Sequence, residues 1–294
     1  STTDFGNNKK LVYRAPCTMG FPGPPDSKKT FQFRKTANYM FMFGNNGCDE
    51  YLYIIDKNDA VKKVLLPANS QLNEIIIGEN ASYIHTKTLI NSAYSYNITV
   101  INEDASLINS VTVNYPTFWG HTLNGILYYP DLPEKLNSST LNGLNIELWR
   151  TNGSSNYMAY EINRGQQQLP QNNFVNMPSQ PRNFFKLQNK IYFIATNEGK
   201  ENLYSLNEDF TFNNGKSNNQ WNEGDNWAGQ IVPFESDDAL IPAGKTPEIN
   251  GNASVKNISV SSPLNLSAGN LNIAGNLNLG TKNTLNGNNL NLKD

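Results

Sequence analysis

Residues able to support catalysis or metal binding are few and scattered along this chain. It has two histidines, His85 and His121, and two cysteines, Cys17 and Cys48. Neither histidine lies near a cysteine pair. The sequence contains no His-x-x-x-His or Cys-x-x-Cys pair, no glycine-rich phosphate loop and no Gly-x-Ser-x-Gly elbow. We therefore expect no catalytic residue, no metal site and no cofactor, and we interpret His85, inside an apolar strand pattern, as structural.

Three carboxylate pairs are the remaining candidates for chemistry, because glycoside hydrolysis uses two facing carboxyl groups. They are Asp49-Glu50, Glu103-Asp104 and Asp237-Asp238. Each lies at an expected turn, and neighbours on a strand point to opposite faces, so we interpret all three as solvated turn residues. A polysaccharide-acting enzyme stays an alternative, since distant residues can meet in a folded cleft. Asp225 could join Asp237 and Asp238 as calcium ligands, but no loop motif fixes them.

Aromatic side chains are better candidates for binding, because sugars stack on aromatic rings and large rings anchor interfaces. The candidate ligand-binding residues gather around one expected repeat and are Trp119, His121, Tyr129, Trp149 and Tyr157. The alternative is that Trp149 and Tyr128 fill the core between repeats.

The composition favours a folded, β-rich, extracellular protein. The 294 residues carry a net charge of −2, with 38% hydrophobic, 16% charged and 11% aromatic residues. Disorder usually requires high net charge and few aromatics, which this chain lacks. Near-neutral charge gives no case for nucleic acid, and no apolar run is long enough for a transmembrane helix. Cys17 and Cys48 either form one disulfide in an oxidising compartment or remain two thiols.

Strand patterns of similar design recur through residues 1–215. Equivalent positions at Tyr39, Tyr83 and Ile126 are 44 and 43 residues apart, and the next step, to Ile191, is 65. We expect the excess to form a loop-like insertion at residues 165–182. A period in the low forties, with three or four strands per unit, is typical of β-propeller blades. A β-sandwich with accidental spacing is the alternative.

One stretch carries a family resemblance. Residues 147–153, Glu-Leu-Trp-Arg-Thr-Asn-Gly, resemble the E-L-W-x-[ST]-[DN]-G-T repeats of secreted propeller-like proteins common in Bacteroidetes. Residues 190–206 look like a weaker copy. The resemblance implies a propeller-like fold over residues 36–215 more than it implies an activity.

The sequence pattern of the chain changes after residue 215. Residues 213–219 indicate a linker or exposed turn, and Trp221 and Trp227 flank a tight turn. Residues 255–292 then repeat short Leu-Asn-Leu units separated by glycine turns. This pattern predicts a parallel β-helix with apolar residues inside, Asn outside and stacked amide ladders. We expect the tryptophan segment, residues 221–241, to cap its open end. Low-complexity disorder and an ice-binding solenoid are the weaker alternatives.

This second half carries the closer resemblance. Trp221, Asn226-Trp227, Gly229, Pro233, 237–239 and Ile241 match a W-NW-G-P-DDA-I module of Bacteroidetes adhesin-like and autotransporter-like surface proteins. Many such proteins leave the cell by type IX secretion, although no sorting domain is visible. Ser1, rather than methionine, is what a processed or trimmed chain would show.

The sequence as a whole predicts an all-β protein. We expect a propeller-like repeat domain at 1–215, and a Trp-rich cap with the start of a parallel β-helix, or solenoid, at 216–294. The predicted function is a non-enzymatic, adhesin-like, secreted or cell-surface protein on the outside of a Gram-negative envelope. Its partner would be a glycan or a protein ligand. The alternatives are a structural partner of an outer-membrane or type IX secretion complex and a polysaccharide-acting enzyme.

Overall fold

The computed structural model describes most of the chain after residue 30. The described ranges are 31–35, 39–45, 50–67, 70–78, 81–91, 93–101, 106–114, 119–132, 146–163, 165–168, 174–188, 190–266, 269–280, 285–287 and 290–292. Their regular structure is β-strand, with one 3-10 turn, η2 (Gly224–Asn226). The all-β prediction is confirmed. Cys17 and Cys48 lie outside the described residues, so their disulfide stays a prediction. No helix in the described ranges is long and apolar enough to cross a membrane.

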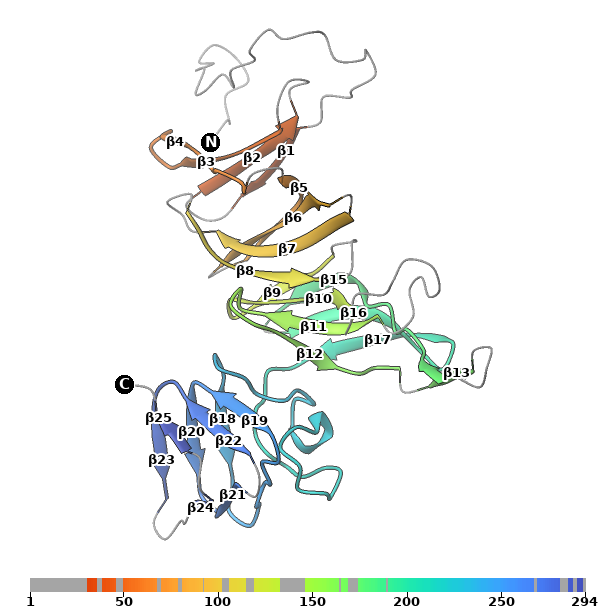
Figure 1. Cartoon of the computed structure of the whole chain (residues 1–294), viewed down its shortest axis with the longest axis vertical. Coiled ribbons are helices and arrows are strands. Elements are labelled where there is room, and N and C mark those ends of the chain that lie inside the picture. Colours follow the sequence, from red (N-terminus) through yellow and green to blue (C-terminus); the bar gives the residue numbers. More distant parts are fainter. Residues whose placement is uncertain are drawn as a thin grey trace, which may run out of the picture. The chain divides into compact units, whose positions relative to one another are not determined.

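Antiparallel strands fill the first part of the chain (Figure 1). They are β1 (Phe31–Lys35), β2 (Tyr39–Asn45), β3 (Glu50–Asp56), β4 (Val61–Lys63), β5 (Ser70–Ile77), β6 (Ser82–Ile90), β7 (Ala93–Ile101), β8 (Leu107–Val113), β9 (His121–Leu123), β10 (Ile126–Asp131), β11 (Glu147–Thr151) and β12 (Asn156–Tyr160). They form three four-stranded sheets in the orders β1-β2-β3-β4, β5-β6-β7-β8 and β12-β11-β10-β9. The predicted recurrence of strand patterns therefore corresponds to successive antiparallel sheets.

The chain divides into two compact units. The first holds Ser1–Asn142 and Thr151–Asn156, and the second holds Gly143–Arg150 and Tyr157–Asp294. The predicted domain boundary between residues 215 and 216 lies inside the second unit and stays a prediction.

In the first unit, neighbouring sheets pack through apolar faces. Phe41 and Ile54 of the first sheet share a core with Ile75 and Ile84 of the second, and each is at most 4% exposed. The Tyr83 hydroxyl donates to the Gly125 carbonyl at 2.6 Å, so the polar end of this buried ring is satisfied. β-strands expose alternate faces, and these sheets bury the face that carries Ile, Leu and Phe.

In the second unit, antiparallel strands precede parallel ones. The antiparallel strands are β13 (Gln166–Gln168), β14 (Phe174–Asn176), β15 (Arg182–Leu187), β16 (Lys190–Asn197) and β17 (Lys200–Leu206). Strands β13 and β14 form a hairpin, and β15-β16-β17 form a three-stranded sheet. The stretch expected to be a loop-like insertion thus contains a paired hairpin, which its Gln-rich composition did not indicate because nothing apolar alternates there.

The parallel strands follow. They are β18 (Asp238–Ile241), β19 (Asn252–Val255), β20 (Asn257–Val260), β21 (Leu264–Leu266), β22 (Asn270–Ile273), β23 (Leu277–Leu279), β24 (Leu285–Gly287) and β25 (Leu290–Leu292). Three parallel sheets run β18-β20-β23, β19-β22-β25 and β21-β24. The paired strands are never immediate neighbours in the sequence.

Most described apolar residues of β18 to β22 point inward, as predicted, whereas Leu240 of β18 and Leu279 of β23 are 42% and 46% exposed. Leu264, Leu266, Leu271 and Ile273 are at most 4% exposed and belong to one core. The first three Leu-Asn units start seven and six residues apart, but hydrogen-bonded partners such as Asn252 and Asn270 are 18 residues apart. Because paired strands are separated by about three units, each short unit forms one side of a larger turn of chain. The predicted amide ladder is present between the Asn252 and Asn270 side chains, at 2.8 Å.

The tryptophan segment, residues 221–241, contributes to the same core. Trp221 and Trp227 are at most 1% exposed, and their rings meet edge to face with centroids 4.7 Å apart. The Trp227 Nε1–H donates to the Trp221 carbonyl at 2.8 Å. Residues 213–219, which were expected to be a linker or an exposed turn, form an exposed turn.

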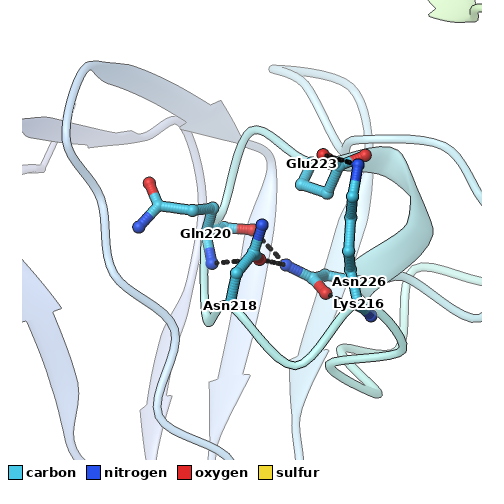
Figure 2. Close-up of polar contacts among 5 residues, drawn as sticks. All are labelled: Lys216, Asn218, Gln220, Glu223 and Asn226. Atoms are coloured by element: carbon cyan, nitrogen blue, oxygen red, sulfur yellow. Dashed lines mark hydrogen bonds and ion pairs between the residues drawn. The ribbon is translucent and has the colours of Figure 1, made fainter.

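Asn226 holds that turn in place (Figure 2). Its side-chain nitrogen donates to Asn218 Oδ1 at 2.6 Å and to the Gln220 carbonyl at 2.8 Å. Its side-chain oxygen accepts from the Lys216 backbone N–H at 2.9 Å. Asn226 is fully buried, so these bonds replace the water that its amide loses on folding.

Truncating the buried indole should weaken the second unit. We expect Trp227→Ala to lower the free energy of unfolding by about 3–5 kcal/mol, because it opens a cavity and removes the bond to Trp221. Urea denaturation followed by circular dichroism measures the change. Trp119→Ala, at an exposed indole, is the matched control. A loss below about 1 kcal/mol for Trp227→Ala would contradict a core role.

Candidate functional site

Glu147 opens the Glu-Leu-Trp-Arg-Thr-Asn-Gly motif on β11. Its side chain is fully buried, and Oε2 accepts a hydrogen bond from the Ile162 backbone N–H at 2.8 Å. Burial raises the pKa of Glu147 to about 7, although hydrogen bonds from Ser179 and from the backbone of Ile162 and Asn163 oppose the rise. The carboxyl group therefore secures the chain that follows β12 and is not open to solvent.

Arg150, on the same strand, is a buried charged residue with several contacts. Its side chain is 1% exposed, and Nη2 lies 2.8 Å from Asp237 Oδ2. Nη2 also donates to the Val232 carbonyl. The guanidinium carbon lies 4.0 Å from the ring centroid of Phe234 and 5.2 Å from that of Phe210. Arg150 is thus held between two aromatic rings and paired with a carboxylate of the tryptophan segment.

Asp237 is the buried partner of this ion pair. Its carboxylate also accepts from the Phe234 backbone N–H at 2.9 Å. Burial raises the pKa of Asp237 to about 6, and the Arg150 guanidinium works against that rise. The interpretation of Asp237 as a solvated turn residue is therefore wrong. Local sequence could not show this, because the cation that draws Asp237 inward lies in a distant strand.

Thr151, Asn152 and Gly153 of the motif, which belong to the first unit, shape a turn. The Thr151 hydroxyl donates to the Ser155 carbonyl at 2.6 Å, and Asn152 Oδ1 accepts from the Ser154 backbone N–H at 2.9 Å. Gly153 has a φ of +91° and packs against Val100, so a side chain there would be strained and would clash. The described contacts therefore give structural roles to five residues of the motif, Glu147, Arg150, Thr151, Asn152 and Gly153.

Three of the predicted ligand-binding residues lie in the first unit. Trp119 is 53% exposed. His121 is half-buried, and its Nδ1–H donates to the Thr122 carbonyl oxygen at 3.0 Å. Tyr129 is fully buried, so its ring contributes to the core, and burial raises the pKa of its hydroxyl well above the usual value. Of these three, Trp119 offers an open ring face.

The other two lie in the second unit. Trp149 is half-buried on β11. Tyr157 is 38% exposed, and its ring is tilted against Phe234 with centroids 4.9 Å apart. Tyr157 therefore joins the surroundings of Arg150 through Phe234 while keeping part of its ring open to solvent.

The remaining carboxylates and His85 either make structural contacts or have side chains that the structure does not describe. Asp49-Glu50 and Glu103-Asp104 lie outside the described side chains. Asp238 is exposed and accepts from the Asn257 side chain at 2.6 Å. His85 stacks on Tyr96, and burial lowers its pKa to about 4. Among the described residues, no group of three or more His, Cys, Asp or Glu side chains could hold a metal ion.

Comparison with known proteins adds little to this geometry. No protein-family model and no curated protein sequence matches the chain. A solved structure that it resembles is the acylaminoacyl peptidase of Pyrococcus horikoshii, with 11% sequence identity and a TM-score of 0.39. The likeness covers 61% of this chain and 37% of the peptidase. A likeness of this size shows neither a shared fold nor a shared activity.

Breaking the buried ion pair should destabilise the protein strongly. We expect Arg150→Met to lower the free energy of unfolding by about 3–5 kcal/mol, because it strands the buried Asp237 carboxylate. Lys216→Met is the control, since it breaks an exposed 2.8 Å pair with Glu223 and should cost less than about 1 kcal/mol. Equal losses in the two variants, measured by urea denaturation, would contradict this assignment.

Glu147 should impose a pH dependence on stability. Its pKa is raised in the folded state, so its contribution is fully present below the unfolded value, about 4.5, and is lost as the pH rises through about 7. Glu147→Gln removes that loss, and we expect it to gain on the order of 2–3 kcal/mol relative to wild type between pH 4 and pH 8. Thermal denaturation across this range is the measurement, with the exposed Glu198→Gln as control. Parallel pH profiles for wild type and Glu147→Gln would disprove the prediction.

Proposed function

We propose that this chain is a non-enzymatic, adhesin-like ligand-binding unit of a secreted or cell-surface protein, with a glycan as its ligand. In this proposal, the antiparallel sheets are propeller-like repeats and the parallel strands are the coils of a β-solenoid. The outer surface of a Gram-negative envelope is the setting that the resemblance of the tryptophan segment implies.

The register of the strands supports the two proposed architectures. Four-stranded antiparallel sheets that follow one another at steps of 44 and 43 residues match the construction of propeller blades. Parallel partners such as Ile258 and Leu277, with apolar residues inside and amides outside, match stacked coils. Repeat architectures of this kind present extended, rigid surfaces to ligands.

The exposed indole of Trp119 is the observation that carries the binding proposal. A tryptophan residue that is 53% exposed leaves apolar surface available for stacking against a sugar. Gly120 beside it packs tightly on β10, because an added Cβ would lie 2.5 Å from the Tyr128 carbonyl oxygen. The backbone under the indole is therefore held against a sheet, which limits the entropy lost on binding.

The buried carboxyl groups also favour binding over hydrolysis. Glu147 is bonded to the backbone of Ile162, and Asp237 is committed to Arg150 and Phe234. A hydrolytic acid needs access to the glycosidic oxygen, and its partner needs access to the sugar ring. Neither carboxyl group has that access while it maintains these contacts.

A glycan array tests the proposal. We expect the folded protein to bind at least one class of glycan, and Trp119→Ala to weaken that binding at least about tenfold, or ~1.4 kcal/mol. Tyr94→Ala, at another exposed ring of the same unit, is the control and should bind as wild type. Absence of binding to every glycan, turnover of a polysaccharide, or wild-type affinity in Trp119→Ala would each refute the proposal.

A further inference from the structure

The β15-β16-β17 sheet of the second unit carries large apolar side chains on both faces. One face is buried, and its residues Ile191, Phe193 and Ala195 are at most 3% exposed. The other face carries Phe185, Leu187 and Leu203, which are 46%, 58% and 64% exposed. An antiparallel sheet with one solvated face normally alternates apolar and polar residues. This sheet breaks that rule, and contiguous exposed apolar patches mark interaction sites.

The register arranges the exposed face in four rows, because paired residues of antiparallel strands share a face. The first row holds Leu187 and Lys190, and the second holds Phe185, Tyr192 and Ser205. The Phe185 and Tyr192 rings are stacked, with centroids 5.3 Å apart.

The other two rows lie nearer the opposite end of the sheet. The third holds Arg182, Ile194 and Leu203, and the fourth holds Thr196 and Glu201. The Arg182 guanidinium pairs with Glu201, whose side chain is 66% exposed. A lysine thus lies at one end of the apolar patch and a carboxylate at the other.

We propose that this face is an interface between two copies of the chain, packed sheet on sheet about a two-fold axis that runs across the strands. Such an axis reverses the strand direction and places the first row over the fourth row of the other copy. Lys190 then faces the row that holds Thr196 and Glu201, and the row of Phe185 and Tyr192 faces the row of Ile194 and Leu203. An axis parallel to the strands and centred on β16 would instead place Lys190 over Lys190, so charge favours the reversed arrangement.

Sheet-on-sheet packing is a contact that this chain already makes. In the first unit, Phe41 and Ile54 of one antiparallel sheet pack on Ile75 and Ile84 of the next. The exposed face of β15-β16-β17 presents the same residue types on the same kind of three- or four-stranded sheet. A second copy supplies a matching face without any other partner.

Analytical ultracentrifugation over a range of concentrations tests the interface. We expect a concentration-dependent dimer for wild type and a monomer for Leu203→Glu, with Leu240→Glu, at a 42% exposed leucine of β18, remaining dimeric. Circular dichroism confirms that each variant is folded. A wild-type monomer at every soluble concentration, or a dimer that survives Leu203→Glu, would overturn the proposal.

Charge variants test the orientation of the two copies. We expect Lys190→Glu and Glu201→Lys each to weaken the dimer at least tenfold, because each places like charges opposite one another. The double variant, Lys190→Glu with Glu201→Lys, should recover most of the loss. Additive weakening in the double variant would overturn the two-fold arrangement.

Discussion

The buried guanidinium of Arg150 needs a counter-charge, and this need organises the second unit. Asp237 supplies it at 2.8 Å, while Phe234 and Phe210 cover the guanidinium. An unpaired charge at this depth would cost several kcal/mol, so β11 and the tryptophan segment are held to one mutual arrangement. The contact joins a strand of the Glu-Leu-Trp-Arg motif to the segment that begins the parallel sheets.

Most described residues of the recognisable motifs maintain the fold. Glu147 secures the chain after β12, Arg150 secures Asp237, and Gly153 allows a turn against Val100. Trp221 and Trp227 are core residues that pack edge to face. Binding is therefore proposed at side chains that these motifs leave open, such as Trp119, and at the exposed face of β15-β16-β17.

Much of the fold could be predicted because its signals are local. Alternating apolar residues indicated the strands, and Leu-Asn-Leu units indicated inward leucines and outward amides, as at Leu264 and Asn265. The Gln-rich hairpin of β13 and β14 was missed because it lacks that alternation. For the candidate site, the sequence could not show that Trp119 is exposed whereas Tyr129 is buried, since both are aromatic residues in similar sequence surroundings.

The sequence by itself determined the all-β class, the change of strand pattern near residue 215 and the inward face of the parallel strands. These features depend on periodicity along the chain. Only the tertiary structure decided that Asp237 is buried, that paired coil strands lie 18, 19 or 21 residues apart, and that one sheet carries large apolar side chains on both faces. Each of these depends on which distant residues become neighbours. Periodicity records the face on which a side chain lies, but not what lies across from it.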